Sequence, residues 1–181
     1  AVKMISLLGV RDTITFFHKM GITTMEQPEK YGPAVALGSG ETKLLDLTYS
    51  FATLANQGRM VGKKSSSTAD TLINNYRSYD PVGILKVEDS TGKVYDEYKP
   101  GQGKQVVSAG AAFLTWNVLS DYPARAPMFG TNSSLNLQIR KAAAKTGTTT
   151  DYKDVTTFGY TPNLAVGIWA GNNDGKEMKP I

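Results

Sequence analysis

The sequence predicts a layered α/β (α+β) fold in which an antiparallel sheet is flanked by helices. Residues 1–62 carry apolar side chains at helical spacing, whereas residues 141–181 form β-rich runs separated by turns. The composition, 40% hydrophobic and 20% charged, is that of a globular chain, and 181 residues suffice to bury a core. No apolar run approaches the roughly 18 to 20 residues that a membrane-spanning helix needs.

Residues 1–62 are predicted to be the helical part. A first helix carries Ile14, Phe17 and Met20 on one stripe, begins near Asp12 or Thr13 and stops at Gly21. The Gly- and Pro-rich segment 31–40 reads as a loop.

A second helix is predicted after Thr42 and before Gly58. Its apolar residues recur at helical spacing: Leu44, Leu47, Phe51, Leu54 and Ala55.

Residues 63–104 are predicted to form a polar excursion, over 63–69, and a hairpin. The hairpin strands, 84–87 and 93–98, flank the turn sequence Asp89-Ser-Thr-Gly92. Residues 105–140 are predicted to form one helix, capped by Ser108, and then a loop over 122–136. The apolar residues of that helix are Ala112, Phe113, Trp116 and Leu119.

The last part, residues 141–181, is predicted to hold three strands. The runs 155–161 and 164–170 form a hairpin around Pro162-Asn163, and 140–149 adds a strand through the polar turn 150–154. Asn172–Gly175 reads as a connecting turn. Trp116 and Trp169 read as core residues because aromatic side chains at helix and strand spacing usually are.

Several functional classes are excluded by composition and motif. Twenty Lys and Arg against sixteen Asp and Glu are scattered, without the basic stripe that nucleic-acid binding requires. The absence of Cys removes thiolate chemistry, and no His or carboxylate spacing suggests a metal site or a cofactor. His18, the only histidine, reads as a packed or surface helix residue rather than a catalytic base. No Gly-x-Ser-x-Gly elbow occurs, and Ala144-Lys-Thr-Gly lacks the glycines of a phosphate loop.

Lys145-Thr146-Gly147 is instead similar to the Lys-Thr-Gly element of active-site-serine penicillin-recognising enzymes. In that element the Lys places a positive charge beside the site, and the Thr hydroxyls can bind a substrate carboxylate. Gly lets a substrate peptide lie against the strand edge, and the N–H that follows it can donate to an oxyanion. The predicted substrate-binding residues are therefore Lys145, Thr146, Gly147 and Thr148, with Tyr152 at the border of the site.

The surroundings of this element closely resemble the transpeptidase domain of class A penicillin-binding proteins. The similar segments are Lys145–Asp154, Phe158-Gly-Tyr-Thr-Pro162, Val166–Asn172, Ala36-Leu-Gly-Ser-Gly40, Leu47–Gly58 and Ile84–Asp89. The opening Ala1-Val-Lys-Met resembles the stretch just after that family's Ser-x-Asn motif. The resemblance implies a fold like that of serine β-lactamases, with a mostly antiparallel sheet and helices on both faces.

The resemblance also implies the activity and the partners. Family members acylate a Ser with the penultimate D-Ala of a peptidoglycan stem peptide, and an amine from a neighbouring stem then takes the acyl group; β-lactam antibiotics trap the same Ser. No cofactor is implied. The parent protein would carry a glycosyltransferase domain and a membrane anchor, and would act on the extracytoplasmic face of the bacterial cell membrane.

The chain is expected to lack the nucleophile. Ser90-Thr-Gly-Lys93 and Ser134-Leu-Asn136 spell the family's Ser-x-x-Lys and Ser-x-Asn motifs, but a hairpin turn and a polar loop are the wrong settings for them. We therefore expect residues 1–181 to be the C-terminal part of one transpeptidase domain, inactive alone and stable only beside its upstream half. Two alternatives remain open: a non-catalytic peptidoglycan- or partner-binding module of the same fold, and a β-lactamase or carboxypeptidase.

Overall fold

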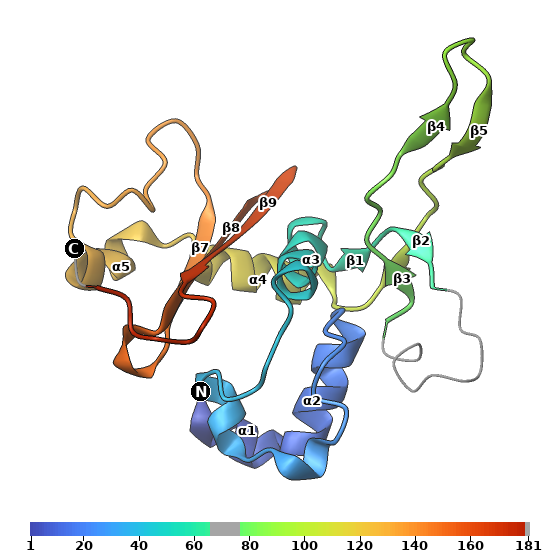
Figure 1. Cartoon of the computed structure of the whole chain (residues 1–181). Coiled ribbons are helices and arrows are strands. Elements are labelled where there is room, and N and C mark those ends of the chain that lie inside the picture. The colour runs from blue at the N-terminus through green and yellow to red at the C-terminus, as the bar shows by residue number, and fades with distance from the viewer. Residues whose placement is uncertain (66–76, 180–181) are drawn as a thin grey trace.

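A computed structural model describes residues 1–65 and 77–179 of the chain (Figure 1). The helices are α1 (Val2–Leu8), α2 (Val10–Lys19), α3 (Leu44–Ala55), α4 (Ala109–Leu119) and α5 (Tyr122–Phe129), with short 3₁₀ helices η1 (Pro28–Lys30), η2 (Pro33–Leu37) and η4 (Thr150–Tyr152). The strands are β1 (Arg59–Met60), β2 (Lys63–Lys64), β3 (Tyr79–Asp80), β4 (Lys86–Glu88), β5 (Val94–Glu97), β6 (Lys104–Gln105), β7 (Ala143–Thr148), β8 (Asp154–Thr161) and β9 (Leu164–Gly171). Most of the predicted polar excursion, 63–69, lies outside the described residues.

The three-stranded antiparallel sheet β7-β8-β9 confirms the strands predicted for the C-terminal part. Helices α3 and α4 pack on the face of the sheet that carries Phe158 and Tyr160. The Phe51 ring of α3 stacks on Phe158 at 5.2 Å between ring centroids and tilts against Tyr160 at 5.8 Å. Burial of these aromatic rings joins the central helix to the sheet.

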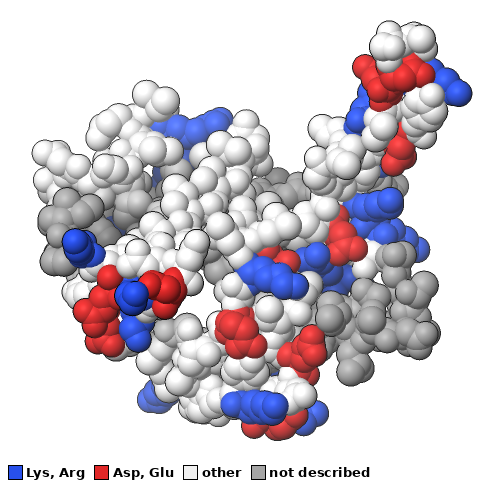
Figure 2. All heavy atoms as spheres, viewed as in Figure 1, with Lys and Arg blue, Asp and Glu red and all other residues white. Residues whose placement is uncertain are grey.

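The opposite face of the sheet is only partly covered, by the loop that carries Ser134, Leu135 and Leu137, and we call it the open face. Alternation along the strands places Leu164, Val166 and Ile168 there, with 62, 44 and 56% of their surfaces exposed. Figure 2 shows an uncharged surface around β8 and β9, with Lys, Arg, Asp and Glu interspersed elsewhere in that view. Among the described residues no helix covers this face, whereas the resemblance implied helices on both.

The N-terminal part has its own small core. Its buried members are Ile5, Ile14, Ile22, Met25 and Val35. The predicted helix start at Asp12 or Thr13 is wrong: α2 begins after Gly9, and the Thr13 hydroxyl donates to the Gly9 carbonyl from inside the helix at 2.8 Å. Gly9, at φ 87°, separates α2 from α1, because this left-handed backbone breaks a continuous helix.

Helix α3 is anchored to the preceding chain through Asp46, which is 2% exposed. One carboxylate oxygen accepts from the Thr23 amide at 2.9 Å and the Thr23 hydroxyl at 2.5 Å, and the other accepts from Arg77 Nη1 at 2.8 Å. Arg77 also binds Asp80 through Nε at 2.7 Å. A buried charge is tolerated because every donor that faces it is paired.

The β4–β5 hairpin is confirmed and projects away from the body of the molecule (Figure 1). Helix α4 begins at the predicted Ser108 cap, whose hydroxyl accepts from the Ala111 amide at 3.2 Å. The loop predicted over 122–136 is wrong in its first half, which forms α5. The Asp121 carboxylate caps α5 by accepting from the Ala124 amide at 3.1 Å, and Pro123 lies in the first turn, where no N–H is needed.

Candidate active-site edge

Strand β7, which carries Lys145–Thr148, is an edge of the sheet, because β8 is its sole partner among the described strands. Lys145 pairs with Phe158 and Gly147 with Thr156. A Cβ added at Gly147 would lie 2.7 Å from the Thr156 hydroxyl oxygen. Any other residue at position 147 would therefore crowd the Thr156 side chain on this face of the sheet.

Hydrogen bonds from side chains show which backbone groups of β7 point away from β8. Arg125 Nη2 donates to the Ala144 carbonyl at 3.2 Å, and the Lys145 ammonium donates to the Thr146 carbonyl. In an antiparallel ladder alternate residues direct both N–H and C=O away from the partner strand. Ala144, Thr146 and Thr148 accordingly present their backbone groups along the free edge.

A cavity of about 750 Å³ opens beside the C-terminal end of β7. One wall is the segment from Leu37 to Leu44, and the other is formed by the end of β7 and the start of β8. Its polar lining includes Ser39, Thr42, Glu41, Thr148, Lys153 and Asp154. The Tyr31 hydroxyl donates to Glu41 at 2.5 Å, and this bond lowers the pKa of the Glu41 carboxyl. The cavity is therefore mixed in character: it carries charges of both signs beside the apolar side chains of Leu47, Phe158 and Trp169.

Hydrogen bonds between Thr149 and Asp154 close the turn from β7 to β8. The Thr149 hydroxyl accepts from the Asp154 amide at 2.9 Å, and the Thr149 amide donates to the Asp154 carbonyl at 3.1 Å. Asp151 and Tyr152 adopt φ values of 61° and 51°, which are uncommon outside glycine. The predicted border residue, Tyr152, is exposed and does not line the cavity.

The two serines that match motif spellings lie far from any helix start. Ser90 is in the β4–β5 turn, where the Asp89 carboxylate accepts from the Thr91 amide at 2.9 Å and the Lys93 amide at 3.1 Å. The Lys93 ammonium lies over the Tyr95 ring instead of beside Ser90. Ser134 lies in an exposed turn. His18 is buried in α2, with Nε2 2.8 Å from the Thr24 carbonyl oxygen.

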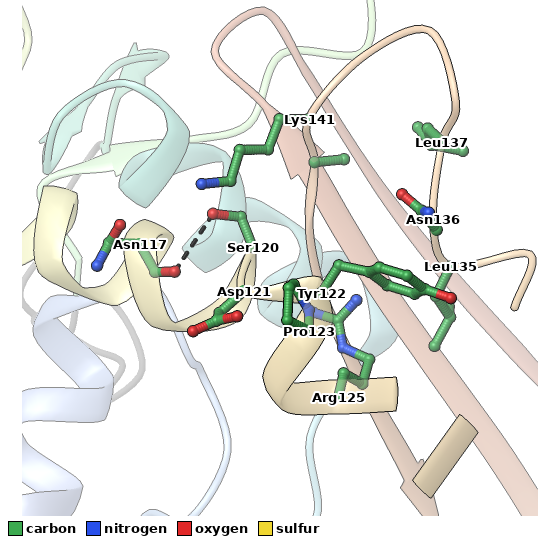
Figure 3. A pocket seen from close by; sticks show the side chains of 11 residues that line it. Asn117, Ser120, Asp121, Tyr122, Pro123, Arg125, Leu135, Asn136, Leu137 and Lys141 are labelled. Atoms are coloured by element: carbon green, nitrogen blue, oxygen red, sulfur yellow. Dashed lines mark hydrogen bonds between the residues drawn. The ribbon is translucent and has the colours of Figure 1, made fainter. Parts of the chain in front are cut away.

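A second cavity, of about 380 Å³, lies between the α4–α5 junction and the segment that leads into β7 (Figure 3). The buried Ser120 hydroxyl donates to the Asn117 carbonyl at 3.3 Å, and the Lys141 side chain extends toward Ser120. Arg125, which holds the β7 edge at Ala144, lines this cavity too. Sequence reasoning missed Arg125 because it expected a loop there.

The described residues hold no cluster of His, Cys, Asp and Glu that could bind a metal ion. None of the helices in the described part of the chain is long and apolar enough to cross a membrane.

Comparison with known proteins shows which proteins the chain is similar to. It is 29% identical over 186 residues to penicillin-binding protein 2D of Bacillus subtilis, covering 100% of the chain and 23% of that protein. It is 31% identical over 168 residues to penicillin-binding protein 1A of Mycolicibacterium smegmatis, covering 87% of the chain and 18% of that protein. The chain thus spans about a fifth of these relatives. No protein-family model matches it.

Solved structures show the same fold. The structure of the PonA1 protein of Mycobacterium tuberculosis in complex with penicillin V superposes with a TM-score of 0.72 at 23% identity, covering 97% of the chain and 45% of the chain in that structure. Penicillin-binding protein 1A of Haemophilus influenzae gives 0.68 at 20% identity, covering 96% of the chain and 28% of that structure. The fold is that of a part of the penicillin-binding transpeptidase domain. Within that class, the chain is a relative of the class A penicillin-binding proteins.

Proposed function

We propose that the chain supplies the Lys-Thr-Gly wall of a serine D-Ala-D-Ala transpeptidase that cross-links peptidoglycan. The observation that carries this proposal is the free edge of β7 beside a cavity that carries charges of both signs, in a chain whose relatives are penicillin-binding proteins. A stem peptide would add to this edge as a strand, bonded to the outward backbone groups of Thr146. Lys145 would attract its carboxylate, and the Thr148 N–H would donate to the oxyanion of the acylation step.

The nucleophilic serine and its lysine, in this proposal, come from an upstream part of the same polypeptide. The settings of Ser90 and Ser134 support this, since neither lies at a helix start from which a lysine one turn on could reach it. The chain spans only 45% of the PonA1 structure that shares its fold. The upstream part would also supply the glycosyltransferase domain and the anchor to the extracytoplasmic face of the membrane.

The open face supports the same division of the domain. Apolar side chains at Leu164, Val166 and Ile168 are costly to leave in water, at roughly 25 cal/mol for each Å² of apolar surface. We propose that residues 1–181 are the C-terminal part of one transpeptidase domain and that upstream residues cover this face. The chain alone would then be less stable than the longer polypeptide.

The test is the rate of acylation by benzylpenicillin in a polypeptide that includes the upstream residues. Lys145→Ala should slow acylation by about ten- to hundredfold, the worth of a charged hydrogen bond. Lys176→Ala is the matched control, since Lys176 pairs with Asp174 on the surface. Ser90→Ala and Ser134→Ala should also leave the rate unchanged. If the Lys145→Ala variant were acylated at the wild-type rate, the proposal that this strand edge binds the substrate would be contradicted.

A further inference from the structure

Helix α5 and the end of α4 lie beside the first half of the free β7 edge. A cavity of about 290 Å³ separates them from the strand, with residues 144–146 on one side and Leu119, Arg125 and Phe129 on the other. None of these residues lines the cavity beside Gly147. The edge therefore has open space beside its first half as well as beside its end.

Three positions on this edge present the same backbone groups to an incoming strand: Ala144, Thr146 and Thr148. Successive positions are two residues apart, which is about 6.6 Å along a strand. A shift of a bound peptide by two residues keeps each of its side chains on the same face, so side-chain alternation does not prevent it. A bare β7 edge would therefore accept a peptide in two registers, one at Thr146 and Thr148 and one at Ala144 and Thr146.

The Arg125 guanidinium occupies the first of these positions. Its Nη2 donates to the Ala144 carbonyl at 3.2 Å and also to the Leu119 carbonyl, so two elements hold it in place. The side chain extends from α5 and is partly buried (Figure 3). The Thr146 carbonyl accepts from the Lys145 ammonium, but that side chain is exposed and flexible, so a peptide N–H can replace it.

We infer that Arg125 is a positioning residue that fixes the register of the substrate peptide by closing the β7 edge at Ala144. In the register that remains, the peptide pairs with Thr146 and Thr148, and its reacting carbonyl lies at the Thr148 N–H. In the closed register the same carbonyl would lie about 6.6 Å away, at Thr146, where it could not react. The inference rests on the proposed function, since it takes β7 as the edge that binds the stem peptide.

The test compares the wild type with Arg125→Ala in the polypeptide that includes the upstream residues. The measured quantity is the inhibition constant of the peptide diacetyl-L-Lys-D-Ala-D-Ala against acylation by benzylpenicillin. Opening the second register adds bound states, so this constant should fall by about two- to tenfold. D-Ala release at saturating peptide should fall by about the same factor, because the shifted peptide does not react. A merely structural role for Arg125 predicts the opposite, weaker binding of the peptide to the variant.

Two further variants serve as controls, and thermal unfolding checks that all variants remain folded. Arg125→Lys keeps a donor for the Ala144 carbonyl, so its inhibition constant should stay within about twofold of the wild type. Arg140→Ala removes an exposed guanidinium that donates to the Asn163 side chain at 3.0 Å, and it should change neither quantity.

An unchanged or raised inhibition constant for the folded Arg125→Ala variant would overturn the inference. So would tighter binding without slower D-Ala release, or the same tightening in Arg140→Ala. If the peptide neither competed with benzylpenicillin nor released D-Ala on the wild type, the proposed function itself would be contradicted, and the inference with it.

Discussion

The backbone N–H of Thr148 offers the sharpest test of the β7 edge, because proline at this position removes it and little else. Alternation from Ala144 directs this N–H away from β8, so Thr148→Pro breaks no ladder bond, and proline is accepted in edge strands at such positions. If the N–H donates to the oxyanion, its loss should cost about 10²–10³ in rate. Thr148→Ala keeps the N–H and should stay within about tenfold of wild type.

The assay is the second-order rate constant for acylation by benzylpenicillin, measured on the polypeptide that includes the upstream residues. Thermal unfolding of both Thr148 variants checks that they remain folded. Equal acylation of the folded proline and alanine variants would refute the oxyanion role of this edge. If the Thr148→Ala variant were acylated as slowly as the proline variant, the loss of rate would come from the Thr148 side chain and not from its N–H.

Three other predictions concern stability and exposure. Asp46→Ala leaves the two buried Thr23 donors without their acceptor and removes one of the two carboxylates that bind Arg77, so it should cost about 2–4 kcal/mol of unfolding free energy. Asp80→Ala, whose side chain is 44% exposed, should cost at most about 1 kcal/mol. Urea unfolding compares the two variants, and equal losses would contradict the anchoring role of Asp46. Hydrogen bonds, of which that from the Thr91 hydroxyl has the largest effect, lower the pKa of Asp89. The stability that the Asp89 carboxylate gives the hairpin is therefore fully present above the ordinary aspartate pKa of about 3.9, and it is lost as the pH falls through the lowered pKa of Asp89. Amide exchange in that turn, corrected for intrinsic rates, should accelerate at such acid pH, and a flat profile would contradict this. Finally, the chain alone should bind the dye ANS at the open face and lose most of that signal when the upstream residues are present; a signal unchanged by those residues would contradict their proposed position.

Elements whose signals are local could be predicted from the sequence. The apolar spacing of α3, the Ser108 cap of α4 and the Pro162-Asn163 turn between β8 and β9 each depend on neighbours in the chain. The same holds for the Asp89 turn, whose carboxylate binds amides two and four residues on. Such elements form from short-range preferences that tertiary contacts only reinforce.

Features that depend on distant contacts could not be predicted. Helix α5 is an exception, since its start signals, the Asp121 cap and Pro123 in the first turn, are local; the Pro, Gly, Asn and Ser content of 122–136 outweighed them and indicated a loop. The Asp46–Arg77 bond joins residues 31 positions apart, with no pattern that links them. The resemblance led us to expect that Lys145–Thr148 lies at a strand edge, but the cavity beside it depends on the segment from Leu37 to Leu44, which is distant in the sequence.

The most direct measurement of the central proposal is the intact mass after incubation with excess benzylpenicillin, taken on the 181-residue chain and on a longer polypeptide that includes the upstream residues. The proposal predicts an unchanged mass for the chain and one covalent penicillin adduct on the longer polypeptide. An adduct on the chain alone would place a nucleophile within these residues and contradict the proposal.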